Sequence, residues 1–211
     1  VVRSDESASK LQAAAIHSLQ VDMDENLVSP AVPAQAQWVY LVPPDRNNLH
    51  DNRLRAWLAA TPAEQRPARL VYISTSGVYG DHQGGWVDER TPVQPETDRA
   101  KRRVDAEQLL HNWCSKHCID LLILRVPGII GIGRDSLNRL QSGEPLIHPD
   151  QAPYTNVVDA DYLAKAILFL ASKAEAGIYN ISDRQPITVT ERYLSLCAQY
   201  AIPVPRFISL E

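Results

Sequence analysis

Short apolar runs that alternate with segments of helical periodicity constrain this chain more than any other feature. Residues 70–75 and 119–126 are continuous aliphatic and aromatic runs, too short for helices and typical of strands buried on both faces. Between them, Thr97 can cap a helix whose apolar residues recur at helical spacing. Strands that alternate with helices of this length predict an α/β fold in which helices cover both faces of a parallel sheet.

The same alternation extends toward both termini. A strand over residues 38–42 is predicted to end at Pro43, because proline has no backbone N–H to donate. The other predicted elements are a short helix over residues 7–15, a helix over 51–60, a helix over 162–171, a strand over 178–181 and a helix over 189–199 started by Thr188 or Thr190.

Charge and composition exclude two classes of partner. The formal net charge of the 211 residues is −4, which gives no basic field for nucleic acid or for an anionic membrane. The apolar runs are too short to span a bilayer, and the N-terminal residues show no signal-peptide pattern. The three cysteines include no Cys-x-x-Cys pair and indicate reduced thiols. We therefore predict a cytoplasmic protein without a nucleic-acid or membrane partner.

A group of potential metal ligands lies on one predicted helix. His111, Cys114, His117 and Cys118 are close together in the sequence. A single helix cannot place four ligands around one ion, so we predict no metal site.

Four motifs occur in the order of one known family. Residues 73–80, Ile-Ser-Thr-Ser-Gly-Val-Tyr-Gly, are similar to the segment S-[ST]-x-x-V-Y-G that ends that family's fifth strand. The other three are residues 124–134, similar to L-R-x-x-x-[IV]-x-G-P-G-R, residues 156–164, similar to [NF]-x-[IV]-H-V-x-D-[LV]-A, and residues 177–181, similar to G-x-Y-N-[IV]. On these motifs the chain resembles the extended short-chain dehydrogenase/reductase family, which includes nucleotide-sugar epimerases and dehydratases.

The resemblance implies a Rossmann-like doubly wound parallel sheet with a small C-terminal substrate lobe. We expect residues 1–135 to form a truncated NAD(P)-binding domain, and residues 136–211 to form a mixed region of substrate lobe and returning sheet elements. The family begins with a strand, a Gly-x-x-Gly-x-x-Gly turn and a helix that hold the cofactor pyrophosphate. The nine glycines form no such array, and residues 1–4 would correspond to the end of the second strand. The N-terminal βα unit is therefore expected to be missing, either truncated or disordered.

The catalytic residues that the resemblance implies are incomplete. In the family, a Ser or Thr, a Tyr and a Lys four residues later cooperate in proton transfer. Thr75 matches the hydroxyl position, but Arg99 and Arg103 stand where the tyrosine and the lysine belong, and residues 81–153 contain no tyrosine. An arginine cannot exchange a proton near neutral pH. Tyr79 is the nearest phenol and a candidate acid, although packing beneath its loop is the favoured alternative.

The resemblance also implies a cofactor site for NADP or NAD. Arg3 and Ser4 follow the presumed second strand and suit the 2′-phosphate of NADP, which we favour over NAD, with a plain turn as the alternative. Asp22 would face the adenine if the third strand ends there. The remaining expected cofactor contacts are Pro43, Ser74, Arg103, Pro127 and Gly128.

Substrate contacts are expected from Ser76, Arg99, Arg134 and Tyr154. Arg134 and Tyr154 occupy positions at which related sugar enzymes grip a nucleotide phosphate or base. Arg99 and Arg103 share one helix face and could bind a phosphate or carboxylate, although a solvated helix face explains them equally well.

Two functions follow from these expectations. The first is an atypical NAD(P)-binding, epimerase/dehydratase-like oxidoreductase that acts on a small or nucleotide-linked carbonyl or alcohol compound without the usual tyrosine. The second is a non-catalytic dinucleotide-binding redox sensor or scaffold. Family members often dimerise through the helix that carries Arg99, so a homodimer is a plausible assembly.

Overall fold

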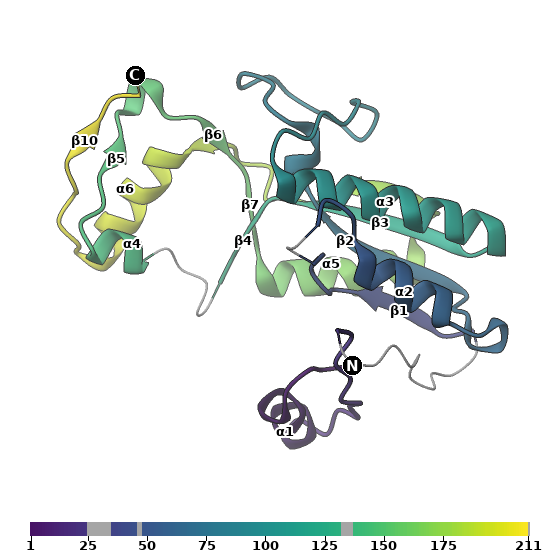
Figure 1. The fold of residues 1–211 in the computed structure, drawn as a ribbon. Coiled ribbons are helices and arrows are strands. Elements are labelled where there is room, and N and C mark those ends of the chain that lie inside the picture. Colours follow the sequence, from purple (N-terminus) through teal and green to yellow (C-terminus); the bar gives the residue numbers. More distant parts are fainter. Residues whose placement is uncertain (25–34, 46–47, 132–136, 211) are drawn as a thin grey trace. The chain divides into compact units, whose positions relative to one another are not determined.

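The computed structural model describes residues 1–24, 35–45, 48–131 and 137–210 (Figure 1). The chain divides into two compact units. The first comprises Val1–Tyr72, Thr97–Ile123 and Glu175–Gly177, and the second comprises Ile73–Glu96, Leu124–Ala174 and Ile178–Glu211. The domain boundary expected between residues 135 and 136 lies outside the described residues.

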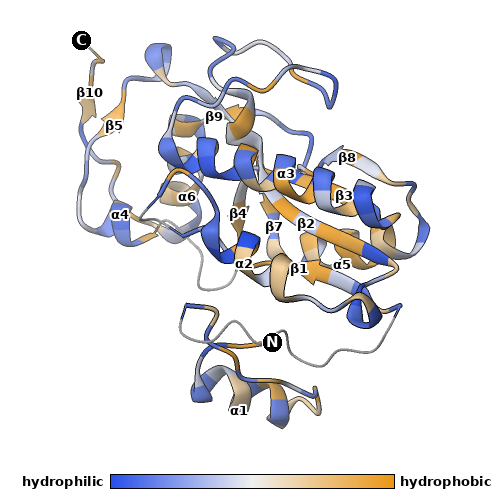
Figure 2. Cartoon of the chain, turned by 45° about the vertical axis from the view of Figure 1, so that its right-hand side comes forward, coloured by the Kyte–Doolittle hydropathy of each residue, from blue (hydrophilic) through white to orange (hydrophobic). Residues whose placement is uncertain are grey.

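A parallel sheet confirms the predicted fold class. Among the described residues its hydrogen-bonded order is β1–β2–β3–β8. Its members are β1 (Gln37–Tyr40), β2 (Arg69–Thr75), β3 (Asp120–Val126) and β8 (Gly177–Asn180). The central residues of β2 are buried, as expected for a strand covered on both faces, and β2 stands out as apolar in Figure 2.

Helices α2 (Asn52–Ala60) and α3 (Asp98–His117) pack against each other in the first unit. The Thr97 hydroxyl accepts a hydrogen bond from the backbone N of Ala100, so α3 begins where the sequence predicts. It ends at Cys118, which adopts the left-handed conformation. The Trp57 ring of α2 lies 4.7 Å from the Trp38 ring of β1, centroid to centroid, which joins helix and strand through an aromatic contact.

The N-terminal segment forms a small element of its own. Helix α1 (Asp5–Ala13) starts two residues earlier than the sequence predicts, because the Ser4 hydroxyl accepts a hydrogen bond from the backbone N of Ser7 and caps it. Val2 forms a parallel bridge with Gln20. A short 3-10 helix, η1 (Ala63–Gln65), precedes β2.

Several short strands of the second unit have no counterpart among the sequence predictions. They pair two by two as β4 (Gly128–Ile130) with β7 (Val157–Asp159), β5 (Leu146–Ile147) with β10 (Phe207–Ile208), and β6 (Tyr154–Thr155) with β9 (Ile187–Thr188). Strands this short carry too few residues to show alternation in the sequence.

The helices of the second unit are α4 (Leu137–Gln141), α5 (Ala160–Lys173) and α6 (Val189–Tyr200), with 3-10 turns η2 (Ser76–Tyr79) and η3 (Pro149–Gln151). Helix α6 begins with a complete capping box, since Thr188 and Glu191 bond each other's backbone N–H groups. Its buried Tyr193 and Cys197 pack with Leu140 and Leu146 into a small core. None of the described helices is long and apolar enough to cross a bilayer.

Asp51 is a buried carboxylate that caps α2. The residue is fully buried, and its Oδ1 accepts a hydrogen bond of 3.0 Å from the backbone N of Leu54. Its Oδ2 has no hydrogen-bond partner. Burial raises the pKa of Asp51 above the ordinary value for aspartate. The folded state therefore holds this proton to a higher pH than the unfolded chain does.

The raised pKa of Asp51 makes the stability of the fold depend on pH. The stability that the protonated Asp51 contributes is present below the pKa of an unfolded aspartate, about 3.9, and is lost as pH rises through the higher folded pKa. Asn caps helices as well as Asp but carries no charge. We expect Asp51→Asn to match the wild type near pH 4 and to exceed its free energy of unfolding at pH 7, by about 1.4 kcal/mol for each unit of raised pKa.

Urea unfolding followed by circular dichroism at both pH values measures this difference. As a control, Asp51→Ala loses the cap and should be destabilised by about 1 kcal/mol relative to Asp51→Asn at pH 7. Parallel pH profiles for Asp51→Asn and wild type would show that the carboxylate is not desolvated.

Candidate functional site

A pocket of about 1580 Å³ lies within the second unit. Its wall includes residues that directly follow three strands of the sheet: Ser76 after β2, Pro127 after β3, and Asn180 and Ile181 at the end of β8. The carboxyl ends of parallel strands are the place where open α/β sheets bind ligands. The position of the pocket therefore makes it the candidate substrate site.

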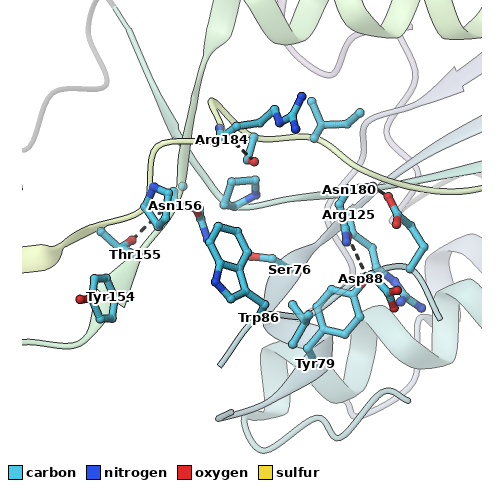
Figure 3. Close-up of a pocket in the computed structure, with 18 of the residues that line it drawn as sticks. Ser76, Tyr79, Trp86, Asp88, Arg125, Tyr154, Thr155, Asn156, Asn180 and Arg184 are labelled. Carbon is cyan, nitrogen blue, oxygen red and sulfur yellow. Dashed lines mark hydrogen bonds between the residues drawn. The ribbon is translucent and has the colours of Figure 1, made fainter. Parts of the chain in front are cut away.

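A buried network holds the inner wall of this pocket together (Figure 3). The Arg125 guanidinium lies 4.8 Å from the centroid of the Tyr79 ring, and both residues are almost fully buried. The Tyr79 hydroxyl donates a 2.8 Å hydrogen bond to Oδ1 of Asn180. The backbone N of Asn180 in turn donates a 2.8 Å hydrogen bond to Oε1 of Glu89. The network thus joins the ends of β2, β3 and β8 to the loop that contains Glu89.

That loop, residues 81–96, is anchored at its two ends. The backbone N of Gln94 donates to the carbonyl of Val78, and the backbone N of Asp81 donates to the Glu96 carboxylate. The Nε2 atom of His82 lies 3.2 Å from the carbonyl oxygen of Tyr79, the last residue of η2. These contacts give the loop a defined path along the pocket.

Aromatic rings make up much of the exposed pocket wall. Trp86 is 87% exposed, and Tyr154, Tyr162 and Phe169 are all more than half exposed. Two cations, Lys165 of α5 and Arg184 after β8, line the same pocket. Large exposed rings beside cations are typical of ligand-binding surfaces rather than of a solvated face.

The hydroxyl residues at the end of β2 have different surroundings. Thr75 Oγ1 accepts a 3.3 Å hydrogen bond from the backbone N of Gly77, and the residue is absent from the pocket wall. Ser76 lines the pocket, whereas Ser74 is buried within the strand. Tyr79 also lines the pocket, but its hydroxyl proton is engaged by Asn180, which favours the packing role over the role of an acid.

Three further expected residues line the same pocket. They are Pro127, Gly128 and Tyr154. Asp159 stands where the family has histidine, and its carboxylate caps α5 by accepting hydrogen bonds from the backbone N of Asp161 and Tyr162. Arg134 lies outside the described residues.

The residues expected at the adenosine end of a cofactor belong to the first unit. Arg3 Nε donates to Asp22 Oδ2 at 3.0 Å, and Arg3 also lies 3.6 Å from Asp24. The backbone N–H of Asp24 and then the Arg3 guanidinium lower the pKa of Asp22. Arg53 donates to Asp24 and to the Pro43 carbonyl, so it connects this acidic segment to the loop after β1.

Arg99 and Arg103 lie on α3 in the first unit. Arg99 is exposed near the start of the helix. Arg103 is partly buried, and its NH1 donates a 2.9 Å hydrogen bond to the hydroxyl of Tyr72. Burial raises the pKa of Tyr72 to about 12, because the charged phenolate is poorly solvated there. Arg103 is therefore a partner of a neutral buried phenol.

Arg3 and Asp22 of the first unit have side chains that suit a nucleotide ribose. A carboxylate such as Asp22 is suited to ribose hydroxyls, and Arg3 is suited to a 2′-phosphate if it leaves Asp22. Pro127 and Gly128, in the second unit, directly follow β3 in the pocket wall. The nine glycines of the sequence form no Gly-x-x-Gly-x-x-Gly turn for the pyrophosphate.

Comparison with known proteins establishes the family. The NAD dependent epimerase/dehydratase family matches residues 45–182, well over half of the sequence. The chain therefore belongs to that family. Among curated proteins it is 35% identical over 117 residues to the protein YeeZ of Escherichia coli (strain K12), an alignment that covers 55% of this chain and 40% of YeeZ. The matched part thus spans less than half of the curated relative.

Solved structures share the fold over most of the chain. A functionally unknown conserved protein from Silicibacter pomeroyi has a TM-score of 0.76 at 26% identity, covering 98% of this chain and 71% of its own. RMD from Pseudomonas aeruginosa, complexed with NADPH, has a TM-score of 0.73 at 20% identity, covering 95% and 83%. The UDP-glucuronic acid 4-epimerase of Bacillus cereus, in complex with NAD, has a TM-score of 0.76 at 16% identity, covering 99% and 76%.

Sequence reasoning missed Trp86, Lys165 and Arg184 as pocket residues. Trp86 lies in a loop whose sequence has no periodicity. The sequence around Lys165 predicts an amphipathic helix but gives no sign that the lysine lines a pocket. The available signal was Trp86 itself, because a tryptophan in a polar, glycine-containing loop has no core to enter.

Gly80 begins the pocket loop in a conformation that only glycine adopts readily. Its φ is 80° and its ψ is −159°, and a Cβ there would collide with the carbonyl oxygen of Gln94. We expect Gly80→Ala to lower the free energy of unfolding by about 2–4 kcal/mol, measured by urea unfolding. Gly143→Ala is the matched control, because Gly143 also has a positive φ but open space around it, and about 1 kcal/mol is expected there. Equal losses would contradict the collision.

Tyr79→Phe separates the packing role of this ring from an acid role. The variant keeps the ring under Arg125 but leaves Asn180 Oδ1 without its donor. We expect the free energy of unfolding to fall by about 1 kcal/mol in urea unfolding. Tyr200→Phe, at a site 45% exposed, should change it by less than about 0.5 kcal/mol. An unchanged stability for Tyr79→Phe would mean that the hydroxyl is free for chemistry.

Proposed function

We propose that this chain is the core of a nicotinamide-dinucleotide-binding oxidoreductase that acts on a small or nucleotide-linked carbonyl or alcohol compound in the pocket of the second unit. The observation that carries the proposal is the convergence of three strand ends on that pocket, at Ser76, Pro127 and Asn180. Membership of the epimerase/dehydratase family supports it.

Each group of residues has a role in this proposal. A nicotinamide dinucleotide, when bound, accepts or returns a hydride. Arg3, Ser4, Asp22 and Pro43 would hold its adenosine end, and Ser74, Arg103, Pro127 and Gly128 its nicotinamide end. Either NADPH or NADH is proposed as the cofactor. NADP is favoured over NAD, since Arg3 would exchange Asp22 for the 2′-phosphate.

The substrate end is formed by side chains of different chemistry. Ser76 supplies a hydroxyl in the pocket wall, and Tyr154 supplies an exposed ring. Thr75 remains the counterpart of the family's hydroxyl residue. Arg99, and Arg134 beyond the described residues, are proposed to contribute charge to an anionic substrate group.

A binding protein without turnover is the second candidate. It is favoured by the absence of tyrosine from residues 81–153, together with the engagement of the Tyr79 hydroxyl by Asn180. In that case the bound dinucleotide itself is the signal. A cytoplasmic location and a homodimer are proposed for either function.

Cofactor titration tests the proposal. We expect NADPH or NADH at about one hundred times its Kd to raise the midpoint of thermal unfolding by about 5 °C, because about 2.7 kcal/mol of binding free energy is added to the folded state. Nicotinamide fluorescence should saturate over the same range. If neither nucleotide changes the midpoint of thermal unfolding and neither gives a saturable fluorescence change, both the oxidoreductase function and the sensor function are wrong.

A further inference from the structure

Trp86 is an exposed tryptophan on an anchored loop. The indole is 87% exposed, whereas Trp38 is buried and Trp57 and Trp113 are partly buried. The loop around it is tied to its own backbone, since the N of Gly85 donates to the carbonyl of His82 at 2.8 Å. A large apolar ring held in water by a defined loop forgoes the burial that stabilises most tryptophans.

The ring faces the pocket and lies near a second exposed ring. In Figure 3 Trp86 is drawn centrally, with Tyr154 on one side and Tyr79 on the other. Gly84, two residues before Trp86, approaches Tyr154 so closely that a Cβ on it would lie 3.4 Å from Cδ2 of the tyrosine ring. The two aromatic side chains therefore come from segments in direct contact.

Charged side chains of both signs line the pocket. Within the described ranges, Lys165 and Arg184 line the pocket without an ion-pair partner for either side chain. The three carboxylates of the wall are engaged by other groups: Asp88 pairs with Arg90, Glu89 accepts a hydrogen bond from the backbone N of Asn180, and Asp81 accepts one from the backbone N of Gln83. Cations without carboxylate partners attract phosphate or carboxylate groups.

We propose that Trp86 is the specificity-determining residue of this pocket, the platform on which the ring of a bound anionic small molecule stacks, with Tyr154 beside it and Arg184 and Lys165 facing the anion. The proposal rests on the function proposed above only in placing the substrate in this pocket. A pocket of about 1580 Å³ favours a small molecule over a protein partner, which would need a broad, flat surface.

Tryptophan fluorescence gives a direct test, because acrylamide quenches an exposed indole before buried ones. The probes are UDP-glucuronic acid, UDP, glucuronic acid and inorganic pyrophosphate, so that base, sugar ring and bare anion are separated. We expect at least one ring-bearing probe to protect Trp86 from acrylamide in a saturable manner, and pyrophosphate to give no protection. Trp86→Ala should weaken binding of that probe about tenfold or more, and Trp86→Phe by less.

Controls separate contact from structure. Trp86→Ala should leave the midpoint of thermal unfolding unchanged, because the indole is exposed. Trp113→Phe, a change of the same kind on α3, should leave probe binding unchanged, and Arg184→Gln should weaken every anionic probe. Affinity that survives Trp86→Ala, or the failure of all ring-bearing probes to protect the indole, would overturn the proposal. If NADPH or NADH still binds in that case, the platform is wrong and the proposed function stands; if neither binds, both fail.

Discussion

The packing of the Arg125 guanidinium on the ring of Tyr79 is the interaction on which the candidate site depends. It brings a charge into the interior at the end of β3 and places it against the residue that ends η2. A buried cation is tolerated only with compensating partners, and the quadrupole of the tyrosine ring supplies one. The Tyr79 hydroxyl and Asn180 extend this interaction to β8, and Glu89 extends it to the loop. The inner part of the pocket wall is therefore connected through one buried arginine.

Much of the fold could be predicted from the sequence, because its main elements are long and periodic. The buried strands β2 and β3 lie within a residue of their predicted bounds, and the helix capped by Thr97 begins where the sequence predicts. The pairs β4–β7, β5–β10 and β6–β9 could not be predicted, since strands of two or three residues leave no pattern and are specified by tertiary pairing.

The candidate site was only partly visible in the sequence. Motif matching selected Ser76, Pro127, Gly128 and Tyr154, all of which line the pocket. It could not reveal that Arg3 is paired with Asp22, because that contact joins residues far apart in the chain. Nor could it find Arg184, whose place in the wall results from the path of the chain after β8.

In the pocket loop, the residues that stabilise the fold are different from the exposed residue that lines the pocket. The path of the loop is held by contacts of Gly80, Glu89 and Glu96, whereas the exposed Trp86 contributes almost nothing to the interior. Selection at position 86 can therefore proceed without loss of folding stability, in contrast to active sites where each change must be compensated elsewhere. Relatives that keep the residues equivalent to Gly80, Glu89 and Glu96 but differ at position 86 would bind different ligands while they keep the same fold.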